Sequence, residues 1–140
     1  MTEPAEGHEL DERECLALLD LGVIGRVVYV DPEQHIRPVN YVRRGWEIYF
    51  RSDRPTPSAE IATFEVDHVD AVGHQGWSVV ARGTARAKRV ELADPDVVER
   101  LEPWAPGPKG WVISIRITEI QGRWVRGAAG GPGLDDRGYV

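Results

Sequence analysis

Cysteine, lysine and long apolar runs are all scarce in this sequence. Cys15 is the only cysteine among 140 residues, which excludes an intramolecular disulfide and any metal site built from several cysteines of one chain. No apolar run reaches the length of a membrane span, and the acidic N-terminus lacks the apolar region of a secretory signal. We therefore expect a cytoplasmic protein with no membrane contact.

Net positive charge is lacking as well. The formal net charge is −6 at pH 7, whereas nucleic-acid binding needs a basic surface or a long basic stripe. The four histidines show no zinc-ligand spacing, and no Gly-x-Ser-x-Gly elbow occurs. These absences argue against nucleic acid, a bound metal and serine-hydrolase chemistry, and they leave small molecules as the expected ligands.

The sequence does contain the short alternating strands of one β domain. Its length suits a single domain, and β-rich segments joined by short turns favour a barrel over an open sheet. We expect a mainly β protein, an antiparallel barrel of six to seven strands with two or three short helices. The predicted domain spans 11–126, between a flexible N-terminus (1–10) and a flexible glycine-rich tail (127–140). One predicted helix spans 11–21, and a second, short helix begins at Asp94-Pro95. The predicted strands span 23–30, 35–42, 46–51, 61–69, 77–90, 111–118 and 119–125.

The first helix carries its own boundary signals. Asp11 is the predicted N-cap, Glu14 its capping-box partner and Gly22 the predicted stop. The same spacing places Cys15 on the apolar face, where a free cysteine behaves as a small hydrophobic residue. In the later strands we expect Gly83 to mark a bend. In the predicted strand 46–51, apolar and polar residues alternate, which predicts a buried face made by Trp46, Ile48 and Phe50.

One segment is locally basic in this acidic protein. Between Arg37 and Arg54 five arginines oppose two carboxylates, and either a solvated strand face or a site for a small anion explains such a cluster. Arg51 can grip a phosphate through two parallel hydrogen bonds, and Thr56-Pro57-Ser58-Ala59 looks like the start of a short, anion-attracting helix. Pro38 interrupts its strand, which marks an edge or a bulge where backbone groups are free to meet a ligand.

Several segments, taken in order, resemble the small pyridoxamine 5'-phosphate oxidase-like proteins over roughly Glu14 to Val125. The resemblance implies a split β-barrel that forms a homodimer and binds FMN in a groove between the subunits. In some branches of that family, deazaflavin F420 or haem takes the place of FMN. The segments are Gly25-Arg26-Val27-Val28, Pro38-Val39-Asn40-Tyr41, Ile48-Tyr49-Phe50-Arg51-Ser52, Phe64-Glu65-Val66-Asp67, Gly76-Trp77-Ser78-Val79-Val80-Ala81-Arg82-Gly83-Thr84-Ala85 and Pro103-Trp104-Ala105-Pro106-Gly107.

The resemblance also implies contacts with each part of the flavin. The isoalloxazine ring would be lined by Pro38, Val39 and Asn40. The strand that runs toward the ribityl phosphate would contribute Phe50, Arg51 and Ser52. Contacts across the groove would come from Trp77 and Ser78. The substrate and any catalytic side chain stay unassigned.

Two departures from the family pattern concern the phosphate. FMN-binding members usually follow the phosphate arginine with a Gly-x-Lys-Leu segment, whereas 53–60 contains no lysine, and Lys109-Gly110-Trp111 replaces the family's Asp-His-Trp. We therefore expect weaker FMN binding than in relatives that have the lysine. Two functions stay open. One is an FMN-binding oxidoreductase acting on a small molecule, and the other is a binding protein that keeps the dimer but holds F420, haem, another anion or no cofactor.

Overall fold

The computed structural model describes residues 6–30, 33–56, 60–101 and 107–127. Eight strands and two α-helices form this part of the chain, with a short 3-10 turn at Val90–Leu92. Parts of three predicted features lie outside these ranges: residues 31–32 of the turn expected at 31–34, residues 57–59 of the helix start expected at 56–59, and nearly all of the glycine-rich tail. The elements are β1 (Glu6–Leu10), α1 (Glu12–Leu19), β2 (Ile24–Val30), β3 (Gln34–Asn40), β4 (Val42–Arg44), β5 (Glu47–Ser52), β6 (Glu60–Asp70), β7 (Gln75–Arg89), α2 (Pro95–Arg100) and β8 (Trp111–Arg126).

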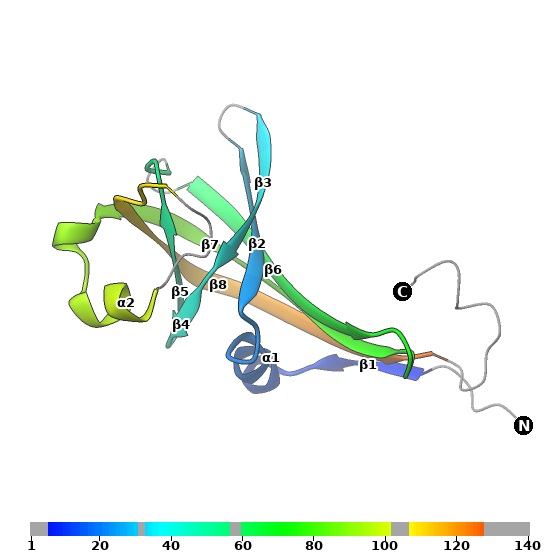
Figure 1. Ribbon diagram of the computed structural model, residues 1–140. Coiled ribbons are helices and arrows are strands. Elements are labelled where there is room, and N and C mark those ends of the chain that lie inside the picture. The colour runs from blue at the N-terminus through cyan, green and yellow to red at the C-terminus, as the bar shows by residue number, and fades with distance from the viewer. Residues whose placement is uncertain (1–5, 31–32, 57–59, 102–106, 128–140) are drawn as a thin grey trace, which may run out of the picture.

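The strands form one antiparallel sheet that curls into a split β-barrel, as predicted (Figure 1). The order of strands is β3-β2-β6-β7-β8-β5-β4, and β1 pairs with the far end of β8. The two long central strands therefore reach beyond the barrel into a narrow arm, formed by β1 and the adjoining ends of β6, β7 and β8 (Figure 1). None of the helices in the described ranges is long and apolar enough to cross a membrane.

The last strand corrects the prediction of two strands over 111–118 and 119–125. β8 is continuous because it pairs with β7 along its whole length, with one register shift at Arg82/Gly83. The predicted bend at Gly83 is confirmed at this bulge. A Cβ at Gly83 would collide with the carbonyl oxygen of Arg116 on β8, so the close approach of the two backbones requires glycine.

The N-terminal residues 6–10 form a strand that the sequence analysis did not anticipate. Their sequence, EGHEL, has no apolar alternation, and the segment is held by its register against β8, from Glu6 opposite Arg126 to Leu10 opposite Gly122. Backbone pairing to an existing sheet edge, and not side-chain pattern, therefore determines this strand.

Helix α1 begins as predicted and ends earlier. The N–H of Glu14 donates to Oδ1 of Asp11 at 2.8 Å, and the N–H of Asp11 donates to Oε1 of Glu14 at 3.0 Å, which completes the predicted capping box. The C-cap is Asp20 and not Gly22. Asp20 is held by a two-bond ion pair with Arg43 on β4, at 2.9 and 2.7 Å, so tertiary contacts end the helix before the glycine is reached.

The main core fills the inner face of the curled sheet. Cys15 belongs to it, as predicted, and a smaller cluster under α2 joins Val97 and Leu101 to Val112 of β8. The predicted buried face of β5 is correct for Ile48 and Phe50 but wrong for Trp46, which is 43% exposed because it lies in the turn before the strand. The fully buried core side chains of largest volume are Phe64, Leu19, Ile48, Ile113 and Ile115.

Candidate functional site

The two edges of the sheet are consecutive in the chain and meet at Tyr41. β3 is one edge and β4 the other, so the predicted single strand over 35–42 is wrong, and the chain crosses from edge to edge after Asn40. The hydroxyl of Tyr41 donates to the carbonyl of Leu19 at 2.5 Å, and its ring meets Phe64 edge-on with centroids 4.9 Å apart. Burial raises the pKa of Tyr41 well above its usual value, so this hydroxyl stays a donor.

Away from Tyr41, β3 is not paired with β4 or β5. β4 covers β5 only along Glu47–Tyr49, and no strand in the described ranges pairs with that side of Phe50–Ser52. β3 likewise pairs with β2 alone, and Pro38 on β3 has no N–H to donate. This gap is the split of the barrel.

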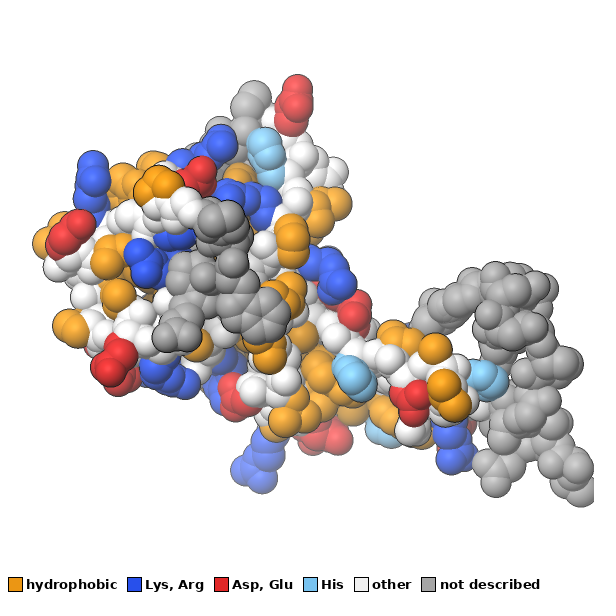
Figure 2. All heavy atoms as spheres, in the orientation of Figure 1, with side chains coloured by type: hydrophobic (Ala, Val, Ile, Leu, Met, Phe, Trp, Pro, Cys, Tyr) orange, Lys and Arg blue, Asp and Glu red, His pale blue; other side chains and the backbone are white. Residues whose placement is uncertain are grey.

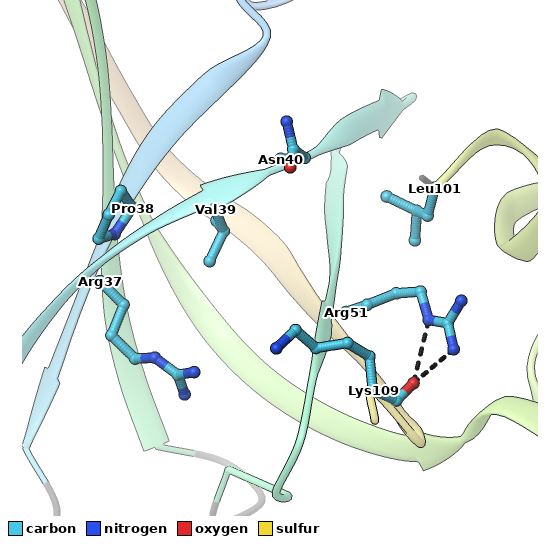
Figure 3. A pocket seen from close by; sticks show the side chains of 7 residues that line it. All are labelled: Arg37, Pro38, Val39, Asn40, Arg51, Leu101 and Lys109. Atoms are coloured by element: carbon cyan, nitrogen blue, oxygen red, sulfur yellow. Dashed lines mark hydrogen bonds between the residues drawn. The ribbon is translucent and has the colours of Figure 1, made fainter. Parts of the chain in front are cut away.

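A pocket of about 80 Å³ lies in the split (Figure 3). Four of the predicted flavin contacts meet there, namely Pro38, Val39, Asn40 and Arg51. Arg37, Leu101 and Lys109 complete the lining. The volume corresponds to two or three water molecules at about 30 Å³ each, far below the roughly 300 Å³ of a site that encloses a whole cofactor. The pocket therefore suits one compact group, with the rest of any larger ligand lying outside it.

Arg51 fixes the loop that carries Lys109. Its Nε and Nη2 donate to the backbone carbonyl of Lys109 at 3.1 and 2.5 Å, a forked arrangement that only a guanidinium provides. The next residue is anchored too, because the carbonyl of Gly110 accepts from the N–H of Val90 at 3.0 Å. With its backbone held, Lys109 extends its side chain across β5 toward β3 (Figure 3).

The pocket is cationic in a protein that is anionic overall. Arg37, Arg51 and Lys109 line it, and no carboxylate is among the described residues of its lining. The nearest recorded counter-charge is Asp53, whose Oδ1 lies 3.6 Å from Nη2 of Arg37 and 3.8 Å from Nε of Arg54. Figure 2 shows basic side chains gathered over the broad barrel end of the molecule. Three cationic side chains around one pocket favour a compact anion such as a phosphate.

Lys109 and Arg37 are the functional residues that the predicted site lacked. The locally basic segment already signalled Arg37, whereas Lys109 stood out only as a departure from the family pattern. Lys109 follows Arg51 by 58 residues, and β5 and β8 must pair, with Ser52 opposite Trp111, before the two meet. No local pattern in the sequence indicates that contact.

The remaining predicted contacts lie elsewhere. Phe50 and Ser52 are each 3% exposed as whole residues, so a ligand in the split has little access to either of them. Trp77 and Ser78 lie on β7, on opposite faces of the sheet, and neither lines the pocket. A contact across a groove needs a second subunit, and for these two residues it stays a prediction.

The fold and site together define a split-barrel protein with a cationic pocket between its open edges. The family described as pyridoxamine 5'-phosphate oxidase matches residues 11–124, and the chain belongs to that family. A putative pyridoxamine 5'-phosphate oxidase from Corynebacterium glutamicum is 34% identical, with a TM-score of 0.70 over 91% of this chain and 98% of that one.

Two mycobacterial proteins are similar as well. The FAD binding protein from Mycobacterium smegmatis is 32% identical, with a TM-score of 0.65 over 84% of this chain and 97% of that one. An uncharacterized protein of Mycobacterium tuberculosis is 31% identical over 130 residues, which cover 81% of this chain and 82% of the relative.

Proposed function

We propose that this protein binds a flavin nucleotide in the split of its barrel, with the flavin phosphate in the pocket of Arg37, Arg51 and Lys109. The observation that carries the proposal is the phosphate-sized pocket in the split, which three cationic side chains line. FMN is the ligand expected from the sequence. The similarity to an FAD binding protein supports a flavin and makes FAD the first alternative, followed by F420 and haem.

Each part of the site has a separate task in this proposal. The flavin supplies the redox chemistry, because hydride and electron transfer belong to its ring. Lys109 and Arg37 neutralise the phosphate, and Arg51 holds the loop of Lys109 in place. Pro38 and Val39 offer apolar surface to the ring from β3, which excludes water from one side.

Lys109 removes the reason to expect weak phosphate binding. The segment after Arg51 lacks the lysine that FMN-binding relatives use, and this absence was the reason to predict weaker FMN binding. The loop before β8 brings a lysine to the same pocket from the opposite direction along the chain. We propose that Lys109 takes over the role of the absent residue.

A second subunit belongs to the proposal because the pocket is too small for a flavin ring. The outer face of the sheet carries exposed aliphatic side chains on three neighbouring strands, with Val30 55%, Ile36 65% and Ile61 74% exposed. Such a patch is typical of a surface that another chain covers. We propose a homodimer, in which a second chain completes the ring site. Sedimentation equilibrium at micromolar concentration tests this point, and a monomer would contradict it.

A visible spectrum after gel filtration with each candidate cofactor tests the proposal directly. Retained FMN or FAD, with riboflavin held more weakly, is expected because riboflavin has no phosphate for the cations. Retention of haem alone, or of nothing, would refute the flavin site and favour a binding protein with another ligand. For the oxidoreductase, bound reduced flavin should be reoxidised by quinones or nitro compounds faster than free flavin; equal rates would leave a flavin-binding protein without that activity.

A further inference from the structure

The inner face of the arm carries a row of four aromatic rings. His8 of β1 lies opposite Trp124 of β8, Trp124 opposite Trp77 of β7, and Trp77 opposite His68 of β6. Residues directly opposite in neighbouring strands share a face of the sheet. The ring centroids of His8 and Trp124 are 5.1 Å apart, and those of His68 and Trp77 are 6.4 Å apart. These four residues are called the aromatic row below.

Helix α1 forms a wall beside the aromatic row. The next row of the sheet includes Gly122, where a Cβ would lie 2.8 Å from the Sγ of Cys15. The missing side chain lets α1 pack directly on the sheet at this point, so the helix rises next to Trp77 and Trp124 and leaves a hollow of about 350 Å³. The hollow is lined by His8, Leu10, Glu14, Ala17, Leu18, Trp77 and Trp124.

This hollow has the size and lining of a small-molecule site. Its volume falls within the roughly 300 to 1,000 Å³ of ligand pockets, whereas the pocket in the split is much smaller. Trp77 and Trp124 are both half-buried, so part of each ring is available to a ligand. Histidine and apolar side chains lie along this narrow end of the molecule in Figure 2.

The charge around the aromatic row is opposite to that of the split. Among the described residues, the lining of the hollow contains the carboxylate of Glu14 and neither lysine nor arginine. The following row of the sheet carries Glu6, Asp70 and Arg126, and Arg126 is paired with Glu6. Tryptophan faces attract cations, and a carboxylate beside them adds to that attraction, so an anionic ligand is disfavoured here.

We propose that the hollow between α1 and the aromatic row binds a planar aromatic cation, such as an N-alkylated pyridinium or quinolinium ring, stacked on Trp77 and Trp124 with Glu14 beside it. This hollow is separate from the pocket in the split, and the proposal replaces the flavin contact that the resemblance implied for Trp77. The cation is chosen over a neutral ring because the described lining combines two tryptophans with one carboxylate, and both kinds of side chain favour positive charge.

Calorimetric titration of the full chain with two rings of matched size and opposite charge tests the proposal. N-methylquinolinium is expected to bind and 2-naphthoate is not. Trp77→Leu and Trp124→Leu should each weaken quinolinium binding about two- to thirtyfold, the range of cation–π contributions. Trp46→Leu is the matched control, because Trp46 is a half-exposed tryptophan outside this hollow, and it should leave binding unchanged.

Glu14→Gln separates the charge from the fold. Glutamine accepts the same bond from the N–H of Asp11, so the capping box survives, and the melting temperature should change little. Quinolinium binding should fall about two- to fivefold, as expected for an exposed ion pair. Equal binding of both rings, or an unchanged affinity in Glu14→Gln, would overturn the choice of a cation.

Two further outcomes would assign the aromatic row differently. If neither ring binds and the tryptophan variants change the sedimentation coefficient, the row is covered by another chain and the small-molecule site is refuted. If riboflavin displaces N-methylquinolinium, the row belongs to a flavin site, and the inference of a separate ligand fails.

Discussion

Replacing Lys109 by alanine isolates the charge that the split contributes to phosphate binding. Arg51 contacts the backbone carbonyl of Lys109 and not its side chain, so Lys109→Ala removes the ammonium group and keeps the anchored loop. A hydrogen bond to a charged group contributes about 1.5 to 3 kcal/mol. FMN affinity should therefore fall roughly ten- to a hundredfold, while riboflavin affinity should stay nearly constant.

Arg51→Ala should be at least as damaging and should not add to Lys109→Ala. Without the guanidinium the carbonyl of Lys109 loses both of its recorded bonds, so the ammonium is no longer positioned, and any direct bond from Arg51 to the phosphate is lost too. In a double-mutant cycle the two losses should overlap by about 0.5 to 3 kcal/mol, as for residues in one network.

Calorimetric titration of FMN and riboflavin against the wild type, both single variants and the double variant measures these quantities. Strictly additive losses would show that Arg51 and Lys109 act independently. Equal losses for FMN and riboflavin would show that the pocket does not hold the phosphate. A matched variant, Lys88→Ala, removes the other lysine of the chain, which lies outside the pocket, and should leave both affinities unchanged.

Three predictions concern the folded state. Gly25→Ala should lower the melting temperature, because a Cβ there collides with the buried ring of Phe64 and overpacking costs about 1 to 3 kcal/mol; Gly110→Ala, with no heavy atom within 4 Å of the added Cβ, is the control. Burial and Asp67 raise the pKa of Glu65 from 4.5 to about 7, so the folded protein holds this proton more tightly than the unfolded chain, and the stability it contributes is lost as pH rises from 4.5 through 7. Glu65→Gln should therefore flatten denaturant-melt stability across that window, and an unchanged slope would contradict the assignment. The Cys15 thiol is fully buried and burial raises its pKa, so it should react with a disulfide reagent only at the rate of unfolding; fast reaction of the native protein would contradict this.

Local signals were enough to predict most elements of this fold. Strand alternation, the Asp11 capping box and the helix opened by Asp94-Pro95 each depend on residues close in sequence, and the structure confirms them. The errors arise where distant contacts override such signals. Arg43 and Asp20 shorten α1, and pairing with β8 turns a polar segment into β1.

The candidate site likewise contains some residues that local sequence predicts and others that only distant contacts bring together. Pro38, Val39 and Asn40 are neighbours in one strand, and a proline in that strand already marks an edge. The contact between Arg51 and Lys109 depends instead on the register of β5 against β8, which no short segment specifies. The residues of the aromatic row come from four strands, and only the assembled sheet places their rings together.

The split also determines how the site can vary in width. In a closed barrel the number of strands and their stagger fix the radius. Here the chain joins the two edges at Tyr41, and beyond it no ladder in the described ranges sets the spacing of β3 and β5. Side-chain contacts, such as the ion pair of Arg37 with Asp53, span that gap instead. The width of the site therefore depends on side chains, whereas the spine of β6, β7 and β8 depends on continuous strand pairing.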